Sequence, residues 1–192
     1  MSLVPAFEIG VWNAWILVFY ILIHASLLSL IFKDAMKQRQ SSDNVQYTKP
    51  EKRINTARLI LLVLIFIYSV FLPLRQGTVW FYAGLPIYLL GLIAYTIVMM
   101  NWVTPTPGEP ATRGLYRYSR HPQYLTQGLL FVGVGVASAS WAFLLYVIVS
   151  MILINILVTA EERFCLERFG QSYQAYLNMT PRWIGVPKSR KN

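Results

Sequence analysis

The sequence predicts an all-α membrane protein with five transmembrane helices, and three observations lead to this prediction. Hydrophobic residues make up 56% of the 192 residues and charged residues only 13%, which leaves too little polar surface for a soluble globule of this size. Long uncharged runs recur along the chain, and about 20 apolar residues are enough for a helix to cross a bilayer. The basic residues fall between some of these runs and are nearly absent between others. We therefore treat residues 1–192 as a single integral membrane domain.

Three N-terminal transmembrane helices are expected within residues 11–103. The uncharged or nearly uncharged runs are 11–32, 59–74 and 79–103. The polar segment 33–53 that follows the first run is expected to be a loop. His24 lies inside the first run, where an ionisable side chain is a functional candidate. A neutral histidine hydrogen-bonded to a neighbouring helix is the alternative that we favour.

A fourth run, residues 129–160, predicts a helical hairpin. It has 32 residues, many more than one straight helix needs to cross about 30 Å of hydrocarbon. Ser138, Ala139 and Ser140 interrupt its large apolar residues near the middle. If the chain turns back there, the polar residues at the two ends of the run meet at one membrane face. The hairpin supplies the fourth and fifth transmembrane helices.

The distribution of positive charge supports this topology. Under the five-helix prediction, 16 of the 17 basic residues share one face and Arg75 alone lies on the other. The positive-inside rule assigns the rich face to the cytoplasm. We expect a multi-pass protein of the cell membrane, with its N-terminus outside and its C-terminus inside, and no nucleic-acid partner. Residues 161–177 are expected to form an interfacial helix, with Gly170 as a possible break.

Two polar motifs flank the hairpin. The first runs from Gly114 through Tyr116 to the sequence Arg120-His121-Pro122-Gln123-Tyr124, and the second is Glu161-Glu162 followed by Phe169-Gly170 and Tyr173. Over about the last 80 residues the chain resembles the isoprenylcysteine carboxyl methyltransferase family and the related membrane phospholipid methyltransferases. The resemblance implies that residues 104–192 form the catalytic region and bind S-adenosylmethionine as methyl donor. It also implies a set of cofactor-binding residues: Tyr116, Arg120, His121, Pro122, Tyr124, Glu161 and Glu162.

The chemistry of these side chains suits such a donor. Its carboxylate suits arginine or protonated histidine, its ribose diol suits a carboxylate acceptor, and its sulfonium suits aromatic faces. Methyl transfer is an in-line displacement that needs alignment of donor and acceptor, and we expect no metal site. The acceptor is expected to be lipid-like or amphipathic. Leu157 stands where the prenylcysteine enzymes carry a substrate-binding arginine, so a carboxylate, an amine and a thiol all stay open as the methylated group.

Two other functions remain open at this point. Membrane sterol reductases, which use NADPH, are similar in the Arg120–Tyr124 pattern and in the C-terminal acidic and aromatic residues, although they are generally larger. A non-catalytic membrane subunit could keep the fold without turnover. The sequence does not indicate an oligomeric state.

Overall fold

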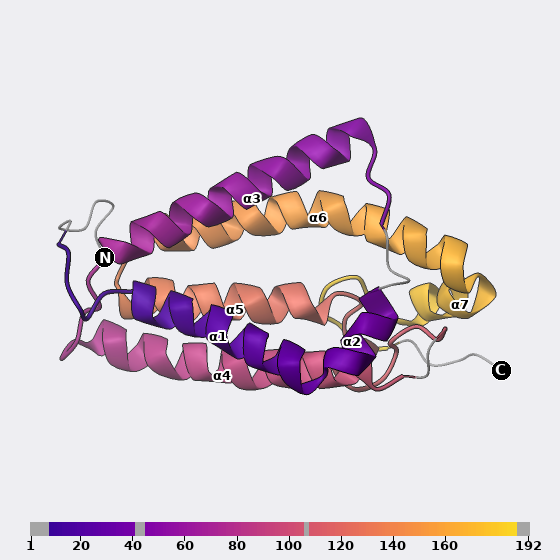
Figure 1. Cartoon of the computed structure of the whole chain (residues 1–192), viewed down its shortest axis with the longest axis horizontal. Coiled ribbons are helices and arrows are strands. Elements are labelled where there is room, and N and C mark those ends of the chain that lie inside the picture. Colours follow the sequence, from indigo (N-terminus) through magenta and orange to yellow (C-terminus); the bar gives the residue numbers. More distant parts are fainter. Residues whose placement is uncertain (1–7, 41–44, 106–107, 188–192) are drawn as a thin grey trace.

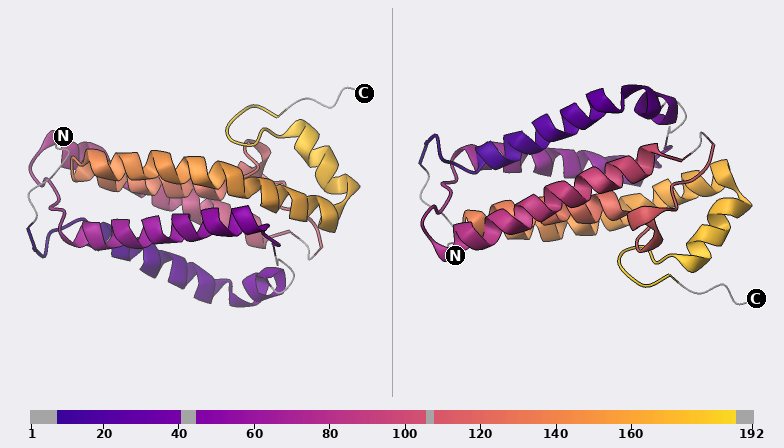
Figure 2. Two further views of the ribbon diagram at one scale, coloured as in Figure 1. Left: turned by 90° about the horizontal axis from the view of Figure 1, so that it is seen from above. Right: turned by 90° about the horizontal axis from the view of Figure 1, so that it is seen from below.

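The computed structural model describes residues 8–40, 45–105 and 108–187, and all the named elements among these residues are helices. Five long helices run side by side along the longest axis of the molecule (Figures 1 and 2). They are α1 (Trp15–Ile31), α3 (Lys49–Val70), α4 (Val79–Val103), α5 (Pro122–Ala137) and α6 (Trp141–Phe169). Two short helices, α2 (Lys33–Gln40) and α7 (Gln171–Met179), and the 3-10 turn η1 (Gly114–Arg117) lie at one end of this bundle.

The helices agree with the expected runs in type and order, and the all-α prediction is confirmed. Three of them, α3, α4 and α6, are long and apolar enough to cross a membrane, and α1 is a shorter apolar helix of 17 residues. The bounds of α4 match the predicted run 79–103. Part of the irregular connection that follows, Thr106 and Pro107, lies outside the described residues.

Two predictions of local structure are corrected. The expected loop 33–53 contains α2 and the first turn of α3, because lysine, glutamate, glutamine and arginine are good helix formers when exposed to water. The expected interfacial helix 161–177 is not one element. Its first half continues α6 to Phe169. The predicted break at Gly170 is confirmed, since this residue, with a φ of 54°, separates α6 from α7.

The predicted hairpin is present. Ala139, with a φ of 51°, forms the turn between α5 and α6. Ser138 Oγ donates a hydrogen bond to the carbonyl of Val134 at 2.9 Å, and Ser140 Oγ accepts one from the backbone N–H of Phe143 at 3.3 Å. The two serines therefore cap the end of one helix and the start of the next.

Small residues bring α4 and α5 into close contact. A Cβ built on Gly84 would lie 2.2 Å from the backbone nitrogen of Ala137, and one on Gly133 would lie 2.5 Å from that of Tyr88. No side chain fits at these two glycines without movement of the opposing backbone. This close approach is typical of helix pairs within membranes, and it makes α5 the central helix, packed against α4 on one side and α6 on the other.

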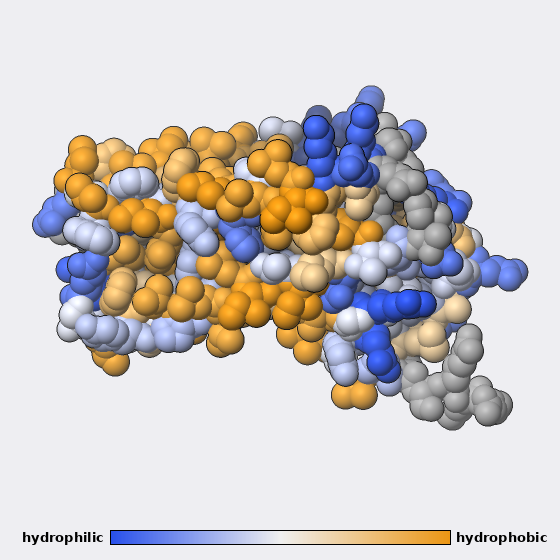
Figure 3. All heavy atoms as spheres, turned by 60° about the horizontal axis from the view of Figure 1, so that its bottom comes forward, coloured by the Kyte–Doolittle hydropathy of each residue, from blue (hydrophilic) through white to orange (hydrophobic). Residues whose placement is uncertain are grey.

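The surface of the bundle agrees with a membrane protein. Hydrophobic side chains cover most of its length, and hydrophilic ones gather at its ends, most of all at the end that carries α7 (Figure 3). His24 faces inward, where its Nε2 lies 2.9 Å from Thr96 Oγ1 of α4. It therefore has the interhelical partner that we favoured. Near the start of α3, the side chain of Glu51 forms an ion pair with Arg163 of α6 at 3.0 Å.

Candidate functional site

The segment around His121 is held against the end of α4. Gly114 begins η1 with a φ of 60°, and a Cβ on it would lie 2.1 Å from Asn101 Nδ2. A larger residue would be strained in this conformation and would also collide with α4. Pro122 is the first residue of α5, a position where proline's missing N–H costs no helical hydrogen bond. The helix therefore begins directly after His121.

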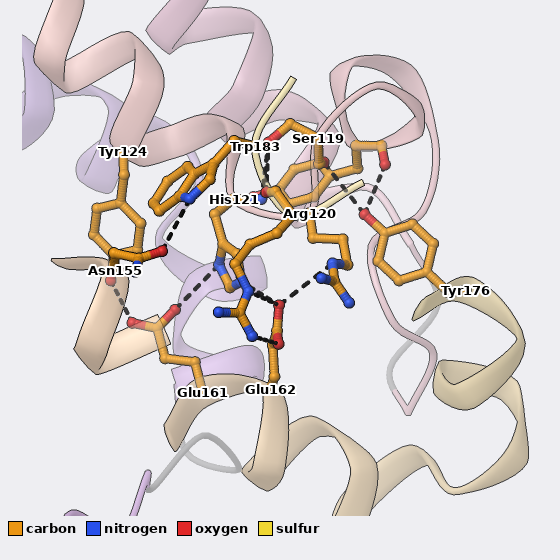
Figure 4. A network of polar contacts seen from close by, with 11 residues as sticks. Ser119, Arg120, His121, Tyr124, Asn155, Glu161, Glu162, Tyr176 and Trp183 are labelled. Carbon is orange, nitrogen blue, oxygen red and sulfur yellow. Dashed lines mark hydrogen bonds and ion pairs between the residues drawn. The ribbon is translucent and has the colours of Figure 1, made fainter. Parts of the chain in front are cut away.

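Glu162 is the centre of an ionic network (Figure 4). It is 7% exposed, and its carboxylate accepts hydrogen bonds from His121 Nε2 at 3.1 Å and from Arg182 Nη2 at 2.6 Å and Nε at 3.2 Å. Arg120 Nε lies 3.3 Å away. The contact between Arg120 and Glu162 is an ion pair without a hydrogen bond, because the Arg120 Nε has no hydrogen-bond partner within the described residues. Three cations from two separate segments thus share one buried carboxylate.

Glu161 points to the other side of His121. Its Oε1 accepts a short hydrogen bond from the Tyr124 hydroxyl, and its Oε2 lies 3.5 Å from His121 Nδ1. The indole of Trp183 packs beside the histidine ring, with centroids 6.1 Å apart, and donates to Asn155 Oδ1 at 3.0 Å. Both nitrogens of His121 therefore face carboxylates, while an aromatic ring covers it (Figure 4).

This environment favours the protonated form of His121. Burial alone would lower its pKa, since a charged ring is poorly solvated at 4% exposure. The hydrogen bonds and negative charges of Glu161 and Glu162 act in the opposite direction and raise the pKa of His121 above its ordinary value of 6.5. An imidazolium with a carboxylate on each side has both of its N–H groups oriented by charge.

The C-terminal segment completes the network. The backbone N–H of Arg120 donates to the carbonyl of Pro181 at 3.1 Å, and that of Gly185 donates to the carbonyl of Tyr118 at 3.1 Å. Ser119 Oγ donates to the carbonyl of Arg182 at 3.2 Å. These bonds lay residues 181–185 along residues 118–120. They bring the Arg182 side chain to Glu162.

A cavity of about 400 Å³ lies beside this network, within the usual range for small-molecule sites. It is bordered by α2, the end of α4, the start of α5, the end of α6 and α7. Its aromatic walls include Trp102, Tyr116 and Phe164, and the side chain of Cys165 also faces it. The buried Tyr116 donates a hydrogen bond to Gln123 Oε1 at 2.8 Å.

The structure brings the two predicted motifs together. Five of the seven predicted cofactor-binding residues line the cavity: Tyr116, Arg120, His121, Tyr124 and Glu161. Pro122 and Glu162 do not line it; Pro122 starts α5, and Glu162 binds the cations behind the cavity wall. Arg182 was not predicted as a site residue, because in the sequence it is only one of the many basic residues of one membrane face. Trp183 was not predicted either, and the structure places it against His121.

The fold and the site define a membrane protein of apolar helices with a ligand-sized cavity at one end of its bundle. Residues 94–172 match the model of the phospholipid methyltransferase family, designated PEMT. This match confirms the resemblance found in the sequence. It begins in α4, includes the His121 motif and the hairpin with its acid pair, and ends at the start of α7. No curated protein matches the chain.

Proposed function

We propose that this protein is a multi-pass membrane methyltransferase that takes a methyl group from S-adenosylmethionine and transfers it to a lipid-like acceptor. The observation that carries the proposal is the cavity of about 400 Å³ beside His121 and Glu161. Most of the residues that line it belong to the part of the chain that matches the methyltransferase family. Apolar helices surround one side of it, so an acceptor with a long apolar chain can approach from the bilayer.

The residues around the cavity fit the proposed donor. Glu161 keeps 19% of its side chain exposed and lines the cavity, so its carboxylate can accept hydrogen bonds from ribose hydroxyls. Arg120 lines it too, and a guanidinium suits a ligand carboxylate. The rings of Tyr116 and Tyr124 offer π faces to a cation. When bound, the donor supplies an electrophilic methyl group on a sulfonium.

The protein's own part in such a reaction is alignment and exclusion of water. The His121 ring is fixed on both sides by Glu161 and Glu162, so the cationic wall of the cavity is oriented before a ligand arrives. Tyr124 is fixed by its bond to Glu161. Side chains that are already held in place need no costly ordering when the reactants bind.

We propose that five helices cross the membrane, with the cavity on the cytoplasmic side. Figure 1 supports this arrangement, since the helix ends and connections that carry most of the basic residues share one end of the bundle, and the connection between α3 and α4, which contains Arg75, lies at the other. At about 1.5 Å per residue, α1 and α5 are about 25 Å long. They would cross together with their flanking residues or where the bilayer is thinner.

Cysteine labelling tests the topology. Single cysteines at the exposed positions Arg75 and Glu167, placed in a Cys165→Ser background, report on the two ends of the bundle. A membrane-impermeant maleimide should label Arg75→Cys in intact cells and Glu167→Cys only after the cells are opened. Labelling of both from outside would contradict the proposed topology.

Calorimetry in an uncharged detergent tests the cofactor. S-adenosylhomocysteine should bind the wild-type protein, and Glu161→Gln should weaken binding by about 10- to 100-fold, the loss expected for a hydrogen bond to a charged group. Glu167→Gln, on the exposed side of the same helix, is the matched control and should bind as the wild type does. A parallel titration with NADPH separates the reductase alternative. Binding of NADPH but not of S-adenosylhomocysteine would reject the methyltransferase proposal.

A further inference from the structure

A second, smaller cleft adjoins the cofactor cavity deeper in the bundle. It lies among α3, α5 and α6 and has a volume of about 70 Å³. Tyr124 and Gln127 line both the cleft and the cavity. The two spaces therefore meet at these side chains, and a molecule in the cleft would lie next to the proposed donor.

One wall of this cleft carries a cation. Arg58 of α3 lines the cleft, and its Nε is buried without a hydrogen-bond partner in the described part of the chain. Among the residues that the structure describes, its guanidinium has one hydrogen-bond partner, Asn55 Oδ1, at 3.4 Å on the same helix. No carboxylate of the described residues pairs with it. A partly buried guanidinium without a counter-ion is unfavourable, so an anion from outside the protein would relieve a real electrostatic cost.

The rest of the cleft is mostly apolar. Leu62, Phe131 and Val147 lie along it, and the neighbouring outer faces of α3 and α6 expose further large apolar side chains, including Val63, Ile148 and Ile152. The volume of about 70 Å³ corresponds to roughly two water molecules, enough for one oxyanion group and not for an acyl chain. An amphiphile would place its charged group inside and its chain along the exposed apolar surface.

We propose that this cleft is a binding site for the methyl acceptor, and that Arg58 recognises an anionic oxygen group, a carboxylate or a phosphodiester, on a molecule with an apolar chain. The identification of this ligand as the acceptor rests on the proposed function; the binding of an anionic amphiphile does not. Arg58 borders the cleft but not the cofactor cavity, whereas Tyr124 and Gln127 border both spaces. The recognised anion and the methylated atom are therefore two separate groups of the acceptor.

Binding of simple amphiphiles tests the site. Laurate and dodecyl phosphate serve as the two anionic probes, with dodecanol and dodecyltrimethylammonium as uncharged and cationic controls, all measured by calorimetry in an uncharged detergent. Wild-type protein should bind at least one anionic probe at one site and neither control. The tighter of the two anions identifies the source of the oxyanion.

Four variants connect this binding to the cleft. Arg58→Gln should weaken the anionic probe about tenfold or more, Arg58→Lys should keep most of the affinity, and Arg53→Gln, the same charge change at an exposed position of α3, should have no effect. Leu62→Trp fills the cleft with Arg58 intact and should also abolish binding. Equal binding by wild type and Arg58→Gln, or equal binding of dodecanol, would overturn the proposal.

The two proposals can fail separately. S-adenosylhomocysteine binding measured in parallel reports on the cofactor cavity. If the anionic probe depends on Arg58 while S-adenosylhomocysteine does not bind, the anion site stands and the methyltransferase assignment falls. The reverse result removes the anion site and leaves the cofactor cavity in place.

Discussion

Replacement of Glu162 by glutamine is expected to destabilise the protein strongly. The carboxylate is 7% exposed and has three positive partners, His121 at 3.1 Å, Arg182 at 2.6 Å and Arg120 at 3.3 Å. Glutamine keeps the shape of the side chain but removes its charge, so three cations would face one another around a neutral amide. Removing one partner of a buried ion pair costs about 3–5 kcal/mol. One third of the Arg182 side chain is exposed and can be solvated, which favours the lower figure of about 3 kcal/mol.

The measurement is thermal unfolding in detergent, followed by near-ultraviolet circular dichroism. For a chain of this size a loss of about 3 kcal/mol corresponds to a fall in Tm of about 6–12 °C. Glu167→Gln makes the same chemical change at an exposed position five residues further along α6, and it should change stability by less than about 0.5 kcal/mol. If Glu162→Gln melts within about 2 °C of the wild type, the network does not stabilise the fold and the argument from buried charge is refuted.

Two further predictions follow from the same structure. Because the pKa of His121 is raised on folding, its contribution to the free energy of unfolding is fully present below pH 6.5 and is lost as the pH rises through the folded-state pKa. Tm should therefore fall over this pH range in the wild type and not in His121→Gln. Parallel profiles of Tm against pH in the two proteins would refute the assignment. Gly84→Ala should destabilise by about 1–3 kcal/mol, because its Cβ would meet the α5 backbone at 2.2 Å. The atom nearest to the Cβ of Gly128→Ala is instead the flexible end of Met151, at 3.1 Å. Equal melting temperatures for the two variants would contradict the close packing of α4 and α5.

The sequence predicted the helices best where hydrophobicity and charge agree. Residues 79–103 form one helix with the predicted bounds, since polar segments end the run on both sides. The hairpin turn at Ala139 was predicted from length and three small residues. The same approach failed at 33–40 and 161–169, because a change from apolar to charged residues indicates where a helix leaves the membrane, not where the helix ends. Gly170 ends α6 through its backbone conformation.

The site was predicted in its principal parts and missed where it depends on distant partners. The hairpin geometry was enough to expect His121 near Glu161 and Glu162. The adjacent glutamates resembled a single acidic pair, yet successive residues on a helix point about 100° apart. Glu161 therefore faces the cavity while Glu162 faces the cations. No sequence pattern distinguished Arg182 from the other basic residues after α6, since its partner lies 20 residues away and is set only by the folded chain.

The shared carboxylate of Glu162 makes the cavity depend on three separate parts of the chain. Residues 118–121 supply Arg120 and His121, α6 supplies both glutamates, and residues 181–185 supply Arg182 together with backbone bonds to Tyr118 and Arg120. The family match ends at residue 172, before the last of these parts. A fragment limited to the matched residues would leave Glu162 without its closest cation and His121 without the cover of Trp183. The matched segment therefore contains most of the cavity's lining, but not the parts of it on α2 and α7 or the contacts of Arg182 and Trp183 behind it.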